Sequence, residues 1–258
     1  MHSLSAILAA VVSLAAEQPS GTGKPAEWKG TVGAGLIYVD GNAFGLSGSL
    51  AAAAERKSED WIVSGRASAT YGEARASGET DRKISAYAAG LLLRLDRRFT
   101  PRLSTYLLGT VETDHVKSVE WRPGGEAGVG YVWIDSKSGD QATLLRTDLG
   151  FRVSQEYRFQ YYPTAMRLEQ PDLFLAPRVG VAFRHQFSKD TVFTEDVEFL
   201  PNVNGPARYL ANSISKLGAK VGASLQFGLA LTVNYDSAPA AGKKQADTVL
   251  AVTLDYVF

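Results

Sequence analysis

Cysteine is absent from this chain of 258 residues. A disulfide scaffold, a thiol nucleophile, a thiolate metal site and a cysteine-linked lipid anchor are therefore excluded. The chain also lacks an excess of charge of either sign, because 27 basic side chains are matched by 27 acidic ones. A net charge of zero leaves no electrostatic footprint for nucleic acid, so we expect no nucleic-acid partner. The 25 glycines and the 10% aromatic content argue against disorder.

Long hydrophobic runs are scarce as well. The one at residues 4–16 is too short to span a bilayer and is followed by Glu17-Gln18-Pro19-Ser20, where the proline ends any helix. We expect residues 1–16 to be a secretory signal peptide, although no Lys or Arg precedes the apolar run; the alternative is an ordinary apolar helix. Residues 17–27 then form a flexible periplasmic lead-in. An exported chain without a spanning helix is either soluble or a transmembrane β-barrel.

In the rest of the chain, residues 28–258, apolar and polar residues alternate at every second position. In residues 225–236, Phe227 and Leu229 fall on an apolar face, whereas Gln226 and Asn234 fall on the other face. Such alternation predicts half-buried strands, and helices of credible length are not indicated. The predicted strands cover residues 28–39, 43–56, 60–74, 81–95, 103–115, 121–135, 142–157, 172–187, 191–201, 208–221, 225–236 and 246–258.

The connections between these segments alternate in length. Short turns at 57–59, 96–102, 136–141, 188–190 and 222–224 separate longer loops, although the first loop, at 40–42, is also tight. Short periplasmic turns and long external loops are typical of outer-membrane barrels. We therefore predict an all-β fold, a transmembrane antiparallel barrel of about 12 strands, with both termini in the periplasm.

The aromatic residues support this membrane interpretation. They gather near strand ends, as interfacial girdles require, at Trp28, Tyr38, Trp61, Tyr71, Trp121, Trp133, Tyr235, Tyr256 and Phe258. The competing interpretation is a soluble periplasmic barrel that binds a hydrophobic ligand within its apolar face. About twelve strands close into a barrel too wide for a purely apolar core of modest side chains, which favours the membrane.

The last residues of the chain carry a targeting pattern. Leu254, Tyr256 and Phe258 alternate along the final strand and end on an aromatic residue. This pattern resembles the signal that the barrel-assembly machinery reads by pairing with an exposed strand. We expect that machinery to be a partner during biogenesis, with outer-membrane lipids and lipopolysaccharide as partners afterwards. The oligomeric state is left open.

Several short motifs, in order, resemble the YdiY-like family of salt-induced outer-membrane proteins, a family without an established activity. The resemblance covers about residues 28–258, except for 157–171. It rests on Trp28-Lys29-Gly30, Gly41-Asn42, Tyr71-Gly72-Glu73-Ala74, Asp96 to Leu103, Gly128-Val129-Gly130-Tyr131, Leu200-Pro201, Tyr235 to Pro239, Lys243-Lys244, Asp247-Thr248 and Phe258. The resemblance implies an outer-membrane location, suggests a link to salt or osmotic stress, and carries over no catalytic residue.

With the apolar face outward, the inward face is rich in charge. The predicted lumen-lining charges are Arg66, Arg94, Glu112, Glu126, Arg146, Asp148, Arg152, Arg178, Arg184, Asp196, Glu198, Lys216, Lys220, Asp236 and Asp255. Two interpretations remain open: a lattice of ion pairs that fills the lumen, or a narrow passive channel whose charges set selectivity. Small inward residues such as Thr31, Gly33, Ser47 and Ser49 place any slit for a solute beside the first two strands.

The sequence offers few candidate catalytic residues. Of the three histidines, His2 leaves with the signal and His185 faces outward near a periplasmic turn. His115, beside Asp114 and near Ser118, is the one candidate base for an outer-membrane enzyme that modifies lipid. A solvated loop histidine is the simpler interpretation, so we predict no enzyme and no cofactor.

Two further features have open interpretations. Carboxylates at 112, 114, 195, 196 and 198 could hold a divalent cation, but no calcium-loop spacing is present, so we expect no metal. The aromatic and basic segment at 156–171 either caps the barrel mouth, or contacts lipopolysaccharide phosphates through arginine, or packs on itself as an extended hairpin.

Overall fold

The computed structural model describes residues 27–39, 44–75, 80–168 and 172–258. The predicted signal peptide, most of the lead-in and the tight turn at 40–42 lie outside these residues. No helix in the described ranges is long and apolar enough to cross a membrane. The strands are β1 (Trp28–Val39), β2 (Phe44–Lys57), β3 (Trp61–Arg75), β4 (Lys83–Arg98), β5 (Leu103–Asp114), β6 (Val119–Ser138), β7 (Gln141–Gln160), β8 (Met166–Arg167), β9 (Asp172–Gln186), β10 (Thr191–Pro201), β11 (Tyr209–Lys220), β12 (Leu225–Asp236) and β13 (Ala246–Val257).

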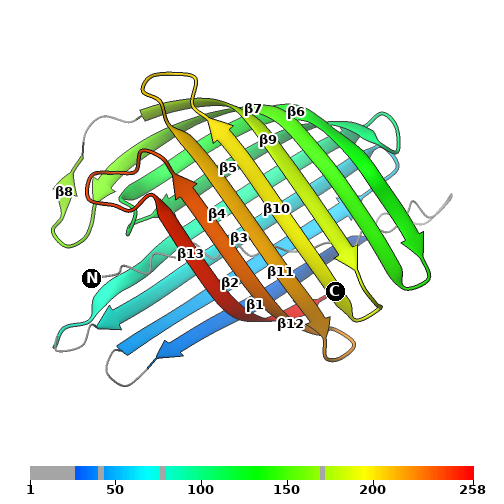
Figure 1. Ribbon diagram of the computed structural model, residues 1–258, viewed down its shortest axis with the longest axis horizontal. Coiled ribbons are helices and arrows are strands. Elements are labelled where there is room, and N and C mark those ends of the chain that lie inside the picture. Colours follow the sequence, from blue (N-terminus) through cyan, green and yellow to red (C-terminus); the bar gives the residue numbers. More distant parts are fainter. Residues whose placement is uncertain (1–26, 40–43, 76–79, 169–171) are drawn as a thin grey trace.

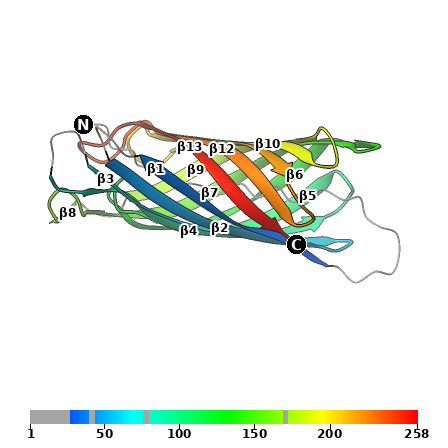
Figure 2. The same cartoon turned by 90° about the horizontal axis from the view of Figure 1, so that it is seen from below.

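Twelve of these thirteen strands form a closed antiparallel barrel. Each strand pairs with its neighbours along the chain, β6 with β7 and β7 with β9, and β1 closes the ring against β13. The short β8 pairs only with the end of β7. The barrel is flattened, so that β1–β5 form one wall and β9–β13 face them across the lumen (Figure 1 and Figure 2). The predicted all-β barrel is confirmed.

The ends of some strands differ from the prediction. Strand β4 continues to Arg98, so that Asp96 lies within the strand and not in a turn. Strands β6 and β7 each have 20 residues and meet at a tight turn, in which Gly139 has a positive φ of 59°. The polar end of this hairpin, around Asp135 and Lys137, is fully solvated. Where both faces of a strand carry polar residues, the alternation of apolar and polar residues disappears. A prediction that rests on this alternation therefore ends these strands too early.

The outward face is apolar along the whole ring. Leu36, Leu50 and Leu107 are more than 60% exposed, and Phe227, Val252 and similar residues are also exposed. In water such a surface would drive aggregation, whereas a bilayer covers it. The inward residues of the same strands, such as Ala230 and Thr232, are buried. The fold therefore has the inverted polarity that a membrane barrel requires.

The two ends of the barrel differ. The C-terminus lies at the end that carries the short turns (Figure 1). The loops that follow β5, β10 and β12 lie at the other end, which is the external end if the termini are periplasmic. Exposed aromatic residues are found near the ends of the strands, among them Trp28, Trp61, Trp121, Trp133 and Tyr256.

The closure between β1 and β13 is short. It includes five residue pairs, from Thr31↔Val257 to Gly35↔Thr253, whereas every other junction of the barrel has at least eight. Reciprocal backbone hydrogen bonds of 3.0 Å between Gly30 and Phe258 extend it at the turn end. A Cβ on Gly30 would meet the Phe258 ring, so glycine is needed where the final aromatic side chain lies across the first strand.

Candidate functional site

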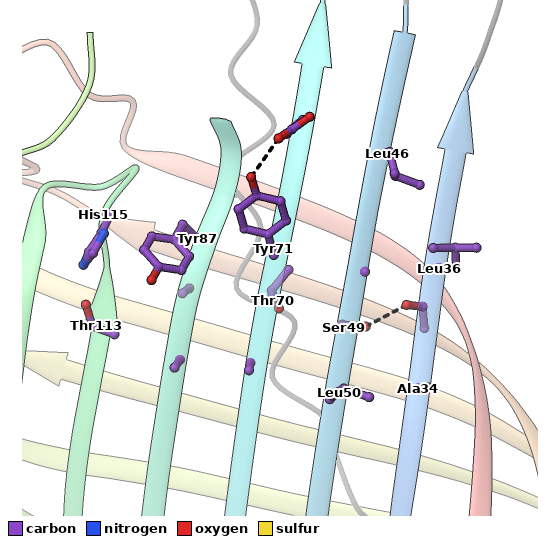
Figure 3. Close-up of a pocket in the computed structure, with 16 residues that line it drawn as sticks. Ala34, Leu36, Leu46, Ser49, Leu50, Thr70, Tyr71, Tyr87, Thr113 and His115 are labelled. Atoms are coloured by element: carbon purple, nitrogen blue, oxygen red, sulfur yellow. Dashed lines mark hydrogen bonds between the residues drawn. The ribbon is translucent and has the colours of Figure 1, made fainter. Parts of the chain in front are cut away.

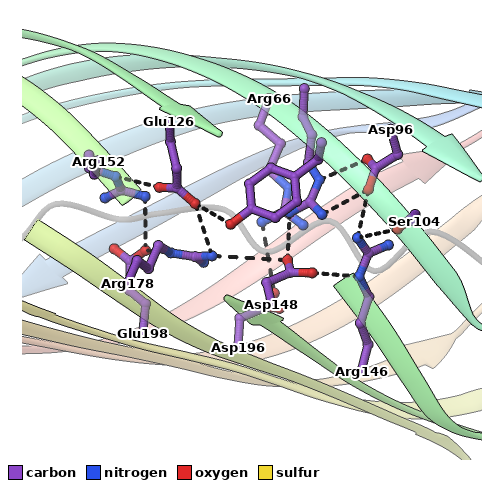
Figure 4. Close-up of polar contacts among 12 residues, drawn as sticks. Arg66, Asp96, Ser104, Glu126, Arg146, Asp148, Arg152, Arg178, Asp196 and Glu198 are labelled. Carbon is purple, nitrogen blue, oxygen red and sulfur yellow. Dashed lines mark hydrogen bonds and ion pairs between the residues drawn. The ribbon is translucent and has the colours of Figure 1, made fainter. Parts of the chain in front are cut away.

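A set of twelve polar residues on the inward face lies together in the lumen and is here called the lumen network (Figure 4). Five arginines in it balance five carboxylates. Its members are Arg66, Arg94, Asp96, Ser104, Tyr106, Glu126, Arg146, Asp148, Arg152, Arg178, Asp196 and Glu198. They come from β3–β7, β9 and β10.

One half of the lumen network is a square of two arginines and two aspartates. Arg94 bonds both Asp96 oxygens at 2.8 Å and reaches Asp148 at 2.6 Å. Arg146 bonds the same two carboxylates, at 2.6 Å for Asp96 and 2.7 Å for Asp148. The Arg94 guanidinium also lies 4.0 Å from the centre of the Tyr106 ring. Each charge thus has two partners of opposite sign, as desolvated ions require.

The other half is built around two glutamates. Arg152 contacts Glu126 at 2.7 Å and Glu198 at 3.2 Å, and Arg178 contacts Glu198 at 2.7 Å and Glu126 at 3.4 Å. The Tyr106 hydroxyl donates a 2.5 Å hydrogen bond to Glu126. Charge-assisted bonds of this kind polarise one another and hold the side chains in one arrangement.

One ion pair of the lumen network crosses the barrel. Arg66 of β3 lies 3.8 Å from Asp196 of β10. These two strands are six places apart in a ring of twelve, so they are diametrically opposite. Both side chains keep contact with solvent, with 41% and 33% of the side-chain surface exposed. Both side chains of this bridge are therefore more exposed to solvent than the arginines of the other ion pairs in the lumen network, which are 13–17% exposed.

A second layer of ion pairs lies at the loop end and is here called the mouth chain. Glu156 is its centre: Arg122 and Arg158 contact it at 2.5 Å, and Arg208 at 3.1 Å. The chain continues from Arg122 to Glu112 at 2.7 Å, and from Arg208 to Asp236 at 2.6 Å. It thus links β5, β6 and β7 with β12 across the mouth.

Two further ion pairs join other parts of the ring. Lys117, in the loop after β5, reaches Asp247 of β13 at 3.1 Å, on the opposite side of the ring. Lys216 pairs with Asp255 at 2.5 Å on the inner face of β11 and β13. The inner face of β1 and β2 is lined by small residues, and the Asp255 carboxylate reaches over one of them, Gly33. These residues are Thr31, Gly33, Gly35, Ser47, Ser49, Ala51 and Ala53.

The predicted lumen charges are distributed among these layers. The structure places Arg66, Arg94, Glu126, Arg146, Asp148, Arg152, Arg178, Asp196 and Glu198 in the lumen network, Glu112 and Asp236 in the mouth chain, and Lys216 with Asp255. Arg184 and Lys220 lie towards the turn end of β9 and β11 and outside both layers.

Four central residues were missing from the predicted set. Asp96 is 2% exposed and bonds two arginines, although the sequence places it in a turn. It follows Arg94 by two positions, so a longer period-two pattern would have included it. Arg122, Glu156 and Arg208 were missed because the register shifts in β6 and because the mouth chain includes strand ends and a loop.

The group required by the lipid-enzyme hypothesis is not assembled. The buried Asp114 accepts backbone hydrogen bonds from Val116 and Lys117. The His115 ring faces outward instead, stacked 3.7 Å from Tyr161 and edge-on 4.4 Å from Tyr87. Burial between these rings lowers the pKa of His115 below its usual range. Within the described ranges, no group of three or more His, Asp or Glu side chains could hold a metal ion.

In the set of carboxylates considered for a cation, Glu195 faces the opposite way from Asp196 and Glu198. Glu195 of β10 lies between the outward residues Phe193 and Val197, and it accepts hydrogen bonds from Ser213, at 2.7 Å, and from Ser215. Asp196 and Glu198 point into the lumen. The carboxylates at 195, 196 and 198 therefore do not form one site.

The predicted aromatic and basic segment at 156–171 includes the end of β7 and packs partly on the barrel. Arg158 contacts Glu156, Tyr157 stacks on Trp121 at 4.7 Å, and Tyr161 stacks on His115. The described part of this segment thus contributes one arginine to the mouth chain and places aromatic rings on the outer surface. Residues 169–171 lie outside the described ranges.

Known structures share this architecture. An outer membrane channel from Pseudomonas putida F1 is 11% identical, with a TM-score of 0.51 over 95% of this chain and 100% of its own. The NanC porin is 8% identical (TM-score 0.48, 89% and 98% covered), and the KdgM porin in complex with disordered oligogalacturonate is 11% identical (0.44, 90% and 99%). At these identities the likeness shows the fold alone, which is the porin-like barrel of outer-membrane channels.

Sequence comparison defines the family. No curated protein matches the chain. A family model described as "Protein of unknown function, DUF481" matches residues 32–258, and it is the model of the YdiY-like proteins that the sequence motifs resemble. Because the match includes nearly all of the barrel, the chain belongs to this family of proteins of unknown function.

Proposed function

We propose that this protein is a narrow passive channel of the outer membrane, with both termini in the periplasm and without chemistry or a cofactor of its own. The observation that carries the proposal is the ion pair between Arg66 and Asp196, which spans opposite walls of the lumen. Charges inside a membrane are costly and mark ion paths or structural pairs. Here most of the paired charges lie away from the inner face of β1 and β2. Small residues line that face, and water and small ions pass along it.

The charge balance supports weak selectivity. Five arginines and five carboxylates alternate in the lumen network, so neither sign dominates the path. The Arg66–Asp196 bridge forms the constriction of this channel, because it joins opposite walls of the lumen while both side chains keep contact with solvent. Larger solutes are excluded as long as the lumen network is intact.

Single-channel recording tests the proposal. The purified chain in planar bilayers should give small conductance steps, and Arg66→Ala should raise the step size about two- to fivefold by removing the bridge. Arg97→Ala is the control, because Arg97 lies at the turn end over the Trp61 ring, 4.9 Å away, and outside the lumen. Silence of wild type and Arg66→Ala at every voltage and salt concentration would overturn the channel.

A second candidate is a role in stabilising the envelope. The mouth chain favours it, because ion pairs that tie β5, β6, β7 and β12 together stiffen the wall without serving transport. A link to salt or osmotic stress belongs to this proposal through the family resemblance. Cells lacking the protein should then lose viability in high salt, and a conductance-dead variant should restore it.

Two further parts of the proposal concern partners. The outward side chains of Leu254, Tyr256 and Phe258 are 44–54% exposed, as a strand presented to the barrel-assembly machinery needs to be. The apolar outer surface supports contact with outer-membrane lipids and lipopolysaccharide. Deleting Phe258 should reduce the amount of folded barrel in the outer membrane without changing synthesis.

A further inference from the structure

A groove runs along the outer, membrane-facing surface of β1–β5 near the loop end (Figure 3). Its volume is about 870 Å³, within the range of roughly 300–1,000 Å³ typical of ligand sites. Small residues form its floor, including Ala34, Gly48 and Ala69, because they leave the sheet surface low. Leu36 and Leu50 stand beside them and are 68% and 63% exposed.

The shape and depth of the groove suit an aliphatic chain. Leu46 and Leu50 mark its extent on β2, roughly 13 Å apart at ~3.3 Å per residue. This length is close to half of the ~30 Å hydrocarbon core of a bilayer. An acyl chain lying over Gly48 would fill the groove and bury its leucine side chains.

The outer end of the groove is aromatic. Tyr71, Tyr87, His115 and Tyr161 form a continuous row, with ring centroids 6.0, 4.4 and 3.7 Å apart in that order. The Tyr71 hydroxyl donates a 2.7 Å hydrogen bond to Glu73. Aromatic side chains with polar edges occupy the membrane interface, where the headgroup of a lipid in the groove would lie.

A cation lies at the same end. Arg82 is 3.7 Å from Glu73, its guanidinium is 4.2 Å from the centre of the Phe44 ring, and 55% of its side chain is exposed. A guanidinium held in place on one side and open on the other is suited to binding phosphate oxygens.

From these contacts we infer that the groove is a binding site for a phosphate-bearing glycolipid of the outer leaflet. One acyl chain lies over Gly48 between Leu36 and Leu50, the sugar contacts the tyrosine row, and a phosphate accepts hydrogen bonds from Arg82. The site is on the outside of the barrel, so it is separate from the proposed conduction path, and it rests on the proposed orientation, which places the loop end in the outer leaflet.

Filling the groove tests the inference. A Cβ on Gly48 would meet no atom within 4 Å, so Gly48→Leu adds a side chain without a clash in the barrel. Gly109→Leu is the matched control, because Gly109 is also a strand glycine with open space around it and lies outside the groove. Ala69→Leu blocks the floor from the next strand and serves as a second blocking variant.

The experiment uses the purified full chain in detergent micelles with lipopolysaccharide as the probe, and native mass spectrometry counts bound molecules. Wild type and Gly109→Leu should bind one molecule with equal affinity, whereas Gly48→Leu and Ala69→Leu should lose about tenfold or more. Arg82→Ala should weaken binding of lipopolysaccharide but not of its dephosphorylated form. Heat-dependent gel mobility verifies that each variant is folded.

Two outcomes would overturn the inference. One is unchanged lipopolysaccharide binding in the folded blocking variants. The other is equally tight binding of phosphatidylethanolamine, which would make the groove an unspecific hydrocarbon surface. Conductance should be the same in Gly48→Leu and wild type, so failure of the channel proposal and failure of the lipid site are separable.

Discussion

At the scale of single residues, Glu156 is the position where substitution should cost the most stability. It is 2% exposed and lies within ion-pair distance of Arg122, Arg158 and Arg208. One carboxylate thus balances three guanidinium groups that the mouth chain holds together. Breaking a buried ion pair leaves uncompensated charge, which costs more than the pair contributes.

We predict that Glu156→Gln destabilises the barrel by about 3–5 kcal/mol, because three arginines then share the remaining carboxylates of the mouth. The temperature at which the folded band disappears in unboiled gels measures this effect. Glu59→Gln is the control, since Glu59 is exposed in the turn after β2. Equal melting of both variants would show that the mouth chain does not stabilise the fold.

Glu195 is a second unusual residue, because it places a carboxylate on the lipid-facing wall. Its oxygens accept hydrogen bonds from Ser213 and Ser215 of the neighbouring strand. These two donors take the place of water, which is missing in the hydrocarbon region.

Replacing both serines by alanine should destabilise the barrel by about 2–4 kcal/mol, since a lipid-facing carboxylate loses its donors. Adding Glu195→Leu to that double variant should restore stability, because an apolar trio needs no hydrogen bonds. Urea unfolding in lipid vesicles, followed by tryptophan fluorescence, compares the three proteins. If the double variant were as stable as wild type, the hydrogen bonds from the two serines would not be what stabilises the Glu195 carboxylate on this wall.

At the scale of elements, the junction of β1 and β13 is the weakest part of the ring. Pairing ends at Gly35↔Thr253, although both strands continue to Val39 and back to Ala246. The strands diverge toward the loop end (Figure 1). Fewer shared hydrogen bonds mean a lower free energy of local opening.

Hydrogen–deuterium exchange should therefore start at this junction. In residues 36–39 and 246–252, the amides that point to the open seam and not to β2 or β12 should exchange well before those in the middle of β10 and β11, which pair over eleven residues. Mass spectrometry of proteolytic peptides from the folded chain in micelles measures the order. Uniform protection around the ring would contradict the prediction.

The sequence predicted the elements well where one face is apolar, because the two-residue period is then visible. Residues 28–39 and 225–236 match β1 and β12 at both ends. The prediction was wrong for the ends of β4 and β6, which extend into turns with polar residues on both faces, and for β7, which continues to Gln160. A strand that leaves the membrane loses the constraint that creates the alternation.

At the scale of the whole molecule, the flattened barrel brings opposite walls within reach of one ion pair. Arg66 and Asp196 meet at 3.8 Å only because β3 and β10 approach each other across the lumen. A hydrated pair at this distance is sensitive to salt, since the Debye length falls from about 10 Å at 0.1 M to about 3 Å at 1 M.

Conductance should accordingly rise more steeply than the conductivity of the solution between about 0.1 and 1 M salt, as screening loosens the bridge. In the double variant Arg66→Ala and Asp196→Ala, conductance should follow bulk conductivity. Recordings of both proteins over a salt series measure the difference. A strictly proportional response of wild type would mean that the bridge does not control the path.

By itself the sequence determined the class of the molecule: an all-β chain whose alternating strands put apolar side chains on one face, with the family motifs in order. Alternation is local, because neighbouring residues of a strand point to opposite faces. It also predicted many of the charges on the inward face, but not Asp96, Arg122, Glu156 or Arg208, and not the partners of any of them.

Only the tertiary structure decided those partners. The Asp96 square, the mouth chain around Glu156 and the bridge from Arg66 to Asp196 join strands far apart in the chain. The groove over Gly48 likewise depends on five strands lying side by side. The physical reason is that ring closure, register and flattening set distances across the barrel, and these are collective properties that no single strand encodes.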